Sequence, residues 1–119
     1  MGTTQSATCE RPRATDGDSV RCNNRSRALR VVAIDAPEMG RCPRYRTCAE
    51  GDPRASKRAL QRLLDRPGNV FRIIGQDRYN RDLVQIIDRR GRNLSCLMVE
   101  QGFADYKPEW SGRYARCRT

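Results

Sequence analysis

One amphipathic helix, set between two groups of short β-rich segments, limits the folds that this chain can adopt. Asp52 is a good helix cap, and Pro53 fits the first helical position. Apolar residues then recur at helical spacing, at Ala55, Ala59, Leu60, Leu63 and Leu64. Pro67-Gly68 ends the pattern. We therefore predict a helix that begins at Pro53 and ends before Pro67.

Three β-rich segments precede this helix and two follow it, at residues 9–15, 19–23, 29–34, 70–75 and 83–88. The first of them has poor strand propensity. A short second helix is expected after Asn93, its cap, and before Gly102. Residues 39–51 are expected to form an irregular loop. This order is that of a small OB-type barrel, so we predict an α+β, mainly β fold in a single domain over residues 1–119: a five-stranded Greek-key barrel with about two helices.

Six cysteines in a short chain favour a disulfide framework. The chain has no CxxC pair, and Cys42 and Cys48 are too far apart for a zinc knuckle, although zinc and free buried thiols remain open. Among the possible pairings we favour nearest neighbours: Cys9–Cys22, Cys42–Cys48 and Cys96–Cys117.

Disulfides indicate an oxidising compartment, so we expect a secreted or periplasmic protein. Residues 1–7 lack the apolar core of a signal peptide. Two interpretations follow: either an export signal has been removed, which we favour, or the protein stays inside the cell.

Arginine dominates the charge of the chain. All but two of the 24 basic residues are arginines, and with 14 acids they leave a formal net charge of +10. Because guanidinium groups match phosphate and basic side chains release its counterions, we expect a polyanionic partner such as nucleic acid. The plainer interpretation is a soluble basic surface.

The same composition excludes several classes of protein. The chain has no histidine, which excludes Ser-His-Asp and Cys-His catalysis and His-ligated zinc. No apolar run approaches the ~20 residues that a membrane-spanning helix needs, so we expect no membrane partner.

Three carboxylates are expected to lie together although they are distant in sequence. Asp18 opens the second strand and Asp35 ends the third. Antiparallel pairing about a turn near residues 24–27 brings these strand ends close. Glu38 follows soon after. With the backbone carbonyl of Ala36, they offer an all-oxygen site that suits Ca²⁺, and less exclusively Mg²⁺ or Mn²⁺.

Two arginines are expected to frame this site: Arg30 in the third strand and Arg81 at the end of the polar loop 77–81. Guanidinium groups beside a divalent cation stabilise the charge that develops in phosphoryl chemistry. Arg30 and Asp35 are five residues apart, so a regular strand would point them to opposite faces and a bend between them is required. Taken singly, each motif has an ordinary explanation as turn chemistry or as solvated charge.

The joint order of the motifs resembles the staphylococcal nuclease-like (thermonuclease) family. The family pattern is DGDT, then R-x-x-x-I-D-x-P-E, then D-[RK]-Y-G-R. This chain has DGDS at residues 16–19, RVVAIDAPE at 30–38 and DRYNR at 77–81. Its LMVEQGFA segment at 97–104 is similar to the closing LV-x-x-G-[LF]-A. The likeness covers roughly residues 15–106 and implies an OB-fold with calcium-dependent cleavage of DNA and RNA.

The resemblance also assigns roles to single residues. It implies that Asp18 and Asp35 bind one Ca²⁺, with the carbonyl of Ala36 standing where the family commonly has Thr. Asp16 is similar to a carboxylate that lies beside the metal ligands.

The resemblance also implies roles for residues that would contact the substrate. Glu38 resembles the general base, or the residue that positions the attacking water. Arg30 and Arg81 are similar to two arginines that clamp the phosphate, and Arg78 and Tyr79 to residues that contact a terminal phosphate.

This chain departs from the family pattern at a few positions. Asn80 replaces glycine in the 77–81 loop, and asparagine tolerates positive φ better than most residues. Ser19 for threonine is a mild change. The loop 42–48 resembles that of cysteine-bearing bacterial members and is expected to flank the substrate groove with Arg44, Tyr45 and Arg46. Three residues compete for the role of the family's aromatic residue near the second helix: Tyr106, Trp110 and Tyr114.

We therefore expect a monomeric, calcium-dependent phosphodiesterase that hydrolyses DNA and RNA with little sequence specificity and leaves 3′-phosphates. Its main alternative is a catalytically silent OB-type nucleic-acid-binding module, and a basic toxin-like or membrane-surface protein is a third possibility. A binding module gains nothing from clustered acids that face a polyanion, which favours the enzyme.

Overall fold

The computed structural model describes residues 5–118. Residues 1–4 and 119 of the predicted domain, and with them the first part of the segment 1–7, lie outside the described residues. It has two α-helices, α1 (Pro53–Leu64) and α2 (Leu94–Glu100), and a 3₁₀ turn, η1 (Gly112–Tyr114). The strands are β1 (Gln5–Ala7), β2 (Arg13–Asp16), β3 (Ser19–Arg21), β4 (Leu29–Val31), β5 (Ile34–Asp35), β6 (Val70–Gln76), β7 (Asp82–Ile87) and β8 (Asp105–Tyr106). Within this part of the chain, no helix is long and apolar enough to cross a membrane.

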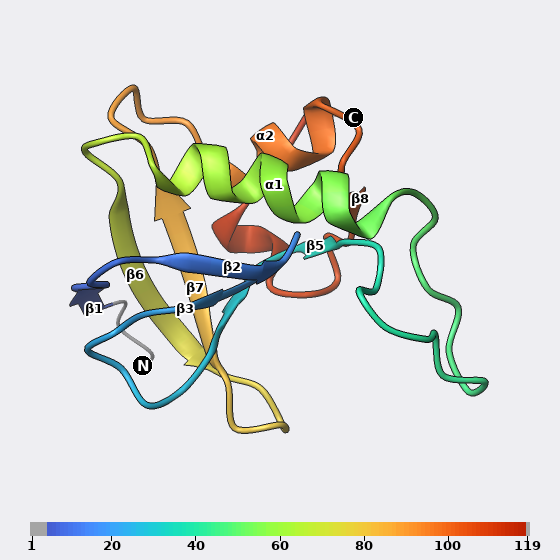
Figure 1. The fold of residues 1–119 in the computed structure, drawn as a ribbon. Coiled ribbons are helices and arrows are strands. Elements are labelled where there is room, and N and C mark those ends of the chain that lie inside the picture. The colour runs from blue at the N-terminus through green and yellow to red at the C-terminus, as the bar shows by residue number, and fades with distance from the viewer. Residues whose placement is uncertain (1–4, 119) are drawn as a thin grey trace.

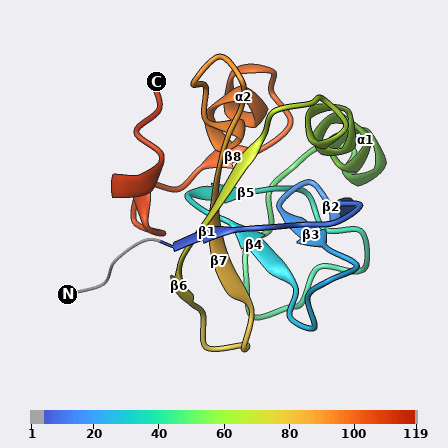
Figure 2. The same ribbon diagram turned by 90° about the vertical axis from the view of Figure 1, so that its left-hand side faces the viewer.

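The strands form a mixed six-stranded sheet in the order β1-β6-β7-β4-β3-β2, with β5 and β8 paired separately (Figures 1 and 2). All pairs are antiparallel except β4 and β7. The predicted α+β class is therefore observed, but closure of a five-stranded barrel is not seen in the described residues. β1 and β2 are the two edges of the sheet, and only the chain at residues 8–12 joins them. This segment forms no strand, and it contains Pro12, which lacks an N–H, and Arg11, at φ 48°.

Helix α1 begins as the sequence predicts. The side chain of Asp52 accepts a hydrogen bond of 2.9 Å from the backbone N–H of Arg54. The helix buries Ala59, Leu60, Leu63 and Leu64 in one core with residues of the sheet and of α2. Gln61 fixes the helix on β2, because its amide nitrogen donates to the carbonyl of Pro12 (3.1 Å) and its amide oxygen accepts from the N–H of Ala14 (2.8 Å).

Three disulfides join neighbouring cysteines: Cys9–Cys22, Cys42–Cys48 and Cys96–Cys117. The first ties the segment after β1 to the end of β3, and the last ties α2 to the C-terminal segment. The middle disulfide closes the irregular excursion between β5 and α1, which extends away from the sheet in Figure 1.

The strand predicted over residues 29–34 is divided into β4 and β5 by a sharp bend. Ala33 adopts φ 64° at this bend. Its N–H donates to the carbonyl of Trp110 (2.9 Å), and its carbonyl accepts from the N–H of Lys107 (2.7 Å). The bend that the spacing of Arg30 and Asp35 requires is therefore present, and the C-terminal segment holds it.

Two loops at opposite ends of β7 share one hydrogen-bond pattern. In the loop 77–81, one carboxylate oxygen of Asp77 accepts from the N–H of Arg81 (3.0 Å) and the other from its guanidinium (2.7 Å). In the loop 88–92, Asp88 receives the same two bonds from Arg92, at 2.8 and 2.9 Å. Burial alone would raise the pKa of both carboxyl groups, but these hydrogen bonds hold both pKa values below the usual range.

The fourth residue of each loop adopts the left-handed backbone conformation, but its residue type differs between the two loops. Asn80 has φ 64° in the first loop, and Gly91 has φ 80° in the second. Glycine adopts such angles without steric cost, and asparagine does so less readily.

We predict that Asn80→Gly leaves the free energy of unfolding unchanged or raises it by up to about 1 kcal/mol, since it relieves the left-handed strain. Urea denaturation of both proteins measures this. Gly91→Asn is the reciprocal control and should lower stability, although a Cβ there meets no atom within 4 Å. A clear loss of stability in Asn80→Gly would contradict the prediction and would show that the Asn80 side chain makes a stabilising bond.

Candidate active site

The turn between β2 and β3 packs directly against helix α1. A Cβ atom on Gly17 would lie 1.8 Å from the hydroxyl oxygen of Ser56, which donates to the carbonyl of Phe103 (2.7 Å). Only glycine fits this contact. Asp16 then closes the turn, because its carboxylate accepts from the N–H of Asp18 at 3.1 Å.

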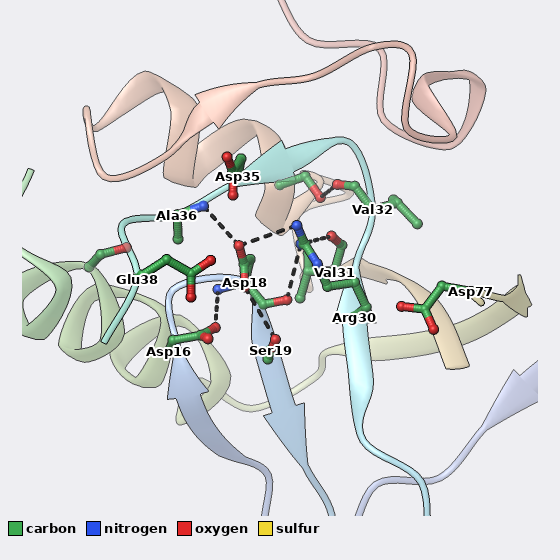
Figure 3. A network of polar contacts seen from close by, with 12 residues as sticks. Asp16, Asp18, Ser19, Arg30, Val31, Val32, Asp35, Ala36, Glu38 and Asp77 are labelled. Carbon is green, nitrogen blue, oxygen red and sulfur yellow. Dashed lines mark hydrogen bonds and ion pairs between the residues drawn. The ribbon is translucent and has the colours of Figure 1, made fainter. Parts of the chain in front are cut away.

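Asp18 is the centre of the polar network in Figure 3. It is 6% exposed, and its Oδ2 accepts a 2.8 Å hydrogen bond from the N–H of Ala36. The guanidinium of Arg30 lies 3.3 Å from the same oxygen, and the hydroxyl of Ser19 donates to Oδ1 at 3.2 Å. One side chain therefore joins β3, β4 and the end of β5.

Burial raises the pKa of Asp18 to about 7. The positive charge of Arg30 opposes this rise, whereas Asp16 adds to it by hydrogen bonding and by its negative charge. Additional positive charge, such as that of a bound cation, would stabilise the ionised form of this buried carboxyl group.

Arg46 joins the other two acids. Its guanidinium lies 3.0 Å from Oδ1 of Asp35, which is 3% exposed, and 2.8 Å from Oε1 of Glu38. Burial alone would lower the pKa of Arg46, but the charges of Asp35 and Glu38 raise it. Nothing in the pattern of the sequence pointed to these pairs, because the loop that carries Arg46 has no periodic structure.

A cleft of about 850 Å³ brings most of the predicted residues together. Seven of them line it: Asp16, Asp18, Arg30, Glu38, Arg78, Tyr79 and Arg81. Asp35 and Ala36 are buried beside it and do not line it. Among the three competing aromatic residues, Trp110 lines the cleft, whereas the hydroxyl of Tyr106 donates to the carbonyl of Ala115.

Arginines lie beside aromatic rings in the cleft. The guanidinium groups of Arg78 and Arg81 lie 5.2 and 5.5 Å from the ring centre of Tyr79. Arg30 lies 5.7 Å from the ring centre of Trp110. Tyr79 is 62% exposed, so its ring is open to a ligand. Such surfaces suit phosphates and stacked bases.

A second hollow, of about 410 Å³, lies near the other end of β7. It is lined by Arg66, Pro67, Asp88, Arg89, Arg90 and Arg92. Its one carboxylate already accepts the bonds from Arg92 described above. It holds no group of acids, so the larger cleft is the candidate active site.

The acids beside the larger cleft form a hard oxygen donor set that fits a divalent cation such as Ca²⁺. Asp18 and Asp35 are buried carboxylates, and each already contacts a guanidinium. Among residues 5–118, however, no three acids, cysteines or histidines are arranged as a ready-made metal site. The carboxylate oxygens are therefore of the kind that calcium binds, but in this structure Asp18 contacts Arg30 and Asp35 contacts Arg46.

Comparison with known proteins identifies the family of the chain. A search of curated proteins finds no match. The family model described as staphylococcal nuclease homologue matches residues 28–117. The matched region includes Arg30, Glu38 and the loop 77–81, and it begins after Asp18. The chain belongs to the staphylococcal nuclease homologue family.

Proposed function

We propose that this protein is a calcium-dependent nuclease that hydrolyses phosphodiester bonds in DNA and RNA. The observation that carries the proposal is a single cleft in which Asp18, Glu38 and Arg81 come together from three distant parts of the chain. Family membership supports nuclease activity, and the arrangement of these residues supports the detailed roles below.

Asp18 and Asp35, with the carbonyl of Ala36, are the proposed ligands of one Ca²⁺. When bound, the ion would polarise a phosphate oxygen and offset negative charge at the reacting phosphorus. Asp16 would hold the turn that orients Asp18, through the hydrogen bond to its N–H.

The two proposed phosphate clamps are oriented by carboxylates of the chain itself. Arg30 contacts Asp18 at 3.3 Å, and Arg81 contacts Asp77 at 2.7 Å. An arginine that is already positioned loses less side-chain freedom when it binds a phosphate. Both would stabilise the negative charge that grows on the phosphoryl oxygens in the transition state.

Glu38 is the proposed general base, or the group that positions the attacking water. Its side chain is 32% exposed and lines the cleft, so water can reach it. It would accept the proton as the oxygen attacks phosphorus. The resemblance supports cleavage of the 5′ P–O bond, which leaves a 3′-phosphate.

Substrate choice would follow from stacking and phosphate contacts. Tyr45, Tyr79 and Trp110 line the cleft and are exposed, and an aromatic face accepts any base. We therefore propose low sequence specificity and a preference for single-stranded or frayed regions, with Arg78 and Tyr79 at a terminal phosphate. The three disulfides support a secreted or periplasmic location, and we propose a monomer.

The proposal predicts that the protein cleaves single-stranded DNA in Ca²⁺ and that a chelator abolishes the cleavage. Glu38→Gln should lower the rate by about 10²- to 10⁴-fold, because the amide cannot accept the proton. Gel analysis of an end-labelled oligonucleotide, with the product ends identified, measures both effects.

Two results would contradict this prediction. Near-normal cleavage by Glu38→Gln would remove Glu38 from the mechanism. Salt-sensitive binding of the oligonucleotide without cleavage in any divalent metal would instead identify a catalytically silent binding module.

A second prediction uses the two matched loops. Arg81→Ala should lower the cleavage rate by about 10²- to 10³-fold, because one phosphate clamp is lost. Arg92→Ala removes the equivalent aspartate-bound arginine at the other end of β7 and should leave the rate close to that of the wild type. Equal losses in both variants would show that the effect of Arg81 is structural, and thermal unfolding of both variants checks that they fold.

A further inference from the structure

The disulfide-closed loop 42–48 carries a positive charge to two acids of the proposed catalytic site. Arg46 contacts Asp35 at 3.0 Å through one guanidinium nitrogen and Glu38 at 2.8 Å through the other. One planar group therefore bridges a proposed metal ligand and the proposed base. No other cation of the described residues forms an ion pair with either acid.

The bridge places a guanidinium where a divalent cation is expected to act. Asp35 is 3% exposed, so a negative charge on it needs a partner. A calcium ion bound by Asp35 would come close to the guanidinium, and two positive groups at one carboxylate repel each other. Calcium and Arg46 therefore compete for the same negative charge.

We propose that Arg46 is a built-in competitor that Ca²⁺ must displace from Asp35, and that the closed loop thereby sets the calcium affinity of the site. This inference rests on the proposed function, since it takes Asp35 as a calcium ligand. Without the ion, Arg46 neutralises the acids; with the ion, its bond to Asp35 is given up.

The loop also determines where the displaced guanidinium goes. Cys42 and Cys48 are linked, so Arg46 lies only two residues from the disulfide that closes its loop. Arg46 and Tyr45 both line the cleft, whereas Arg44, which was also expected to flank the groove, does not line it. The freed arginine therefore stays at the cleft, where it can contact a substrate phosphate.

The test is isothermal titration calorimetry of CaCl₂ into the metal-free full-length protein, at fixed pH and ionic strength. Arg46→Ala should bind calcium about two- to fivefold more tightly than the wild type, which corresponds to the loss of the one ion pair, between Arg46 and Asp35, that calcium must break. Arg44→Ala is the matched control: it removes an exposed arginine from the same loop, outside the lining of the cleft, and should leave the affinity unchanged.

A second variant tests the loop rather than the charge. Replacing Cys42 and Cys48 together by serine keeps Arg46 but opens its loop, and the other two disulfides remain. We expect calcium affinity to rise in the same direction as in Arg46→Ala, because the open loop holds the guanidinium less firmly.

The outcomes separate this inference from the proposed function. Equal or weaker calcium binding by Arg46→Ala would overturn the inference while leaving the calcium site in place. An equal gain in Arg44→Ala would also overturn it, since general surface charge would then explain the effect. Absence of calcium binding in both the wild type and Arg46→Ala would overturn the calcium site itself, and the inference with it.

Discussion

The fold and the candidate site both depend on the burial of one carboxylate. Asp18 is enclosed where β3, β4 and β5 meet, and its partners are a backbone N–H, a hydroxyl and a guanidinium. A buried charge that loses its partner costs several kcal/mol, so these strand ends are held in one arrangement. The sheet is thus ordered around the group that is proposed to bind calcium, and the bend after β4 brings Ala36 to it.

The sequence predicted the parts of this molecule that depend on local chemistry. The cap and apolar face of α1, the order of the main strands and the two helices follow from spacing and propensity. β1 and β8 could not be predicted, because strands of three and two residues exist only through distant partners. Barrel closure was expected from element order alone, but a proline and a left-handed residue interrupt the joining segment.

In the candidate site, too, some features could be predicted from the sequence and others could not. Residues within the three motifs could be assigned by resemblance, whereas the contacts of Arg46 come from an irregular loop and depend on tertiary structure. Three of the four arginines that line the cleft share a property that composition hides: Arg30, Arg46 and Arg81 each contact a carboxylate. The net charge of +10 therefore attracts a polyanion to the protein, while the cleft itself is close to neutral.

The Cys42–Cys48 disulfide has a consequence for how the protein responds to proteolysis. The loop that it closes is exposed at Arg44 and at Tyr45, which is 86% exposed, so it offers a cleavage site to trypsin-like proteases. A cut after Arg44 would fall between the two linked cysteines. The fragments would stay covalently joined, and the segment after the cut would remain next to the cleft. A nicked molecule would therefore migrate as one chain until it was reduced.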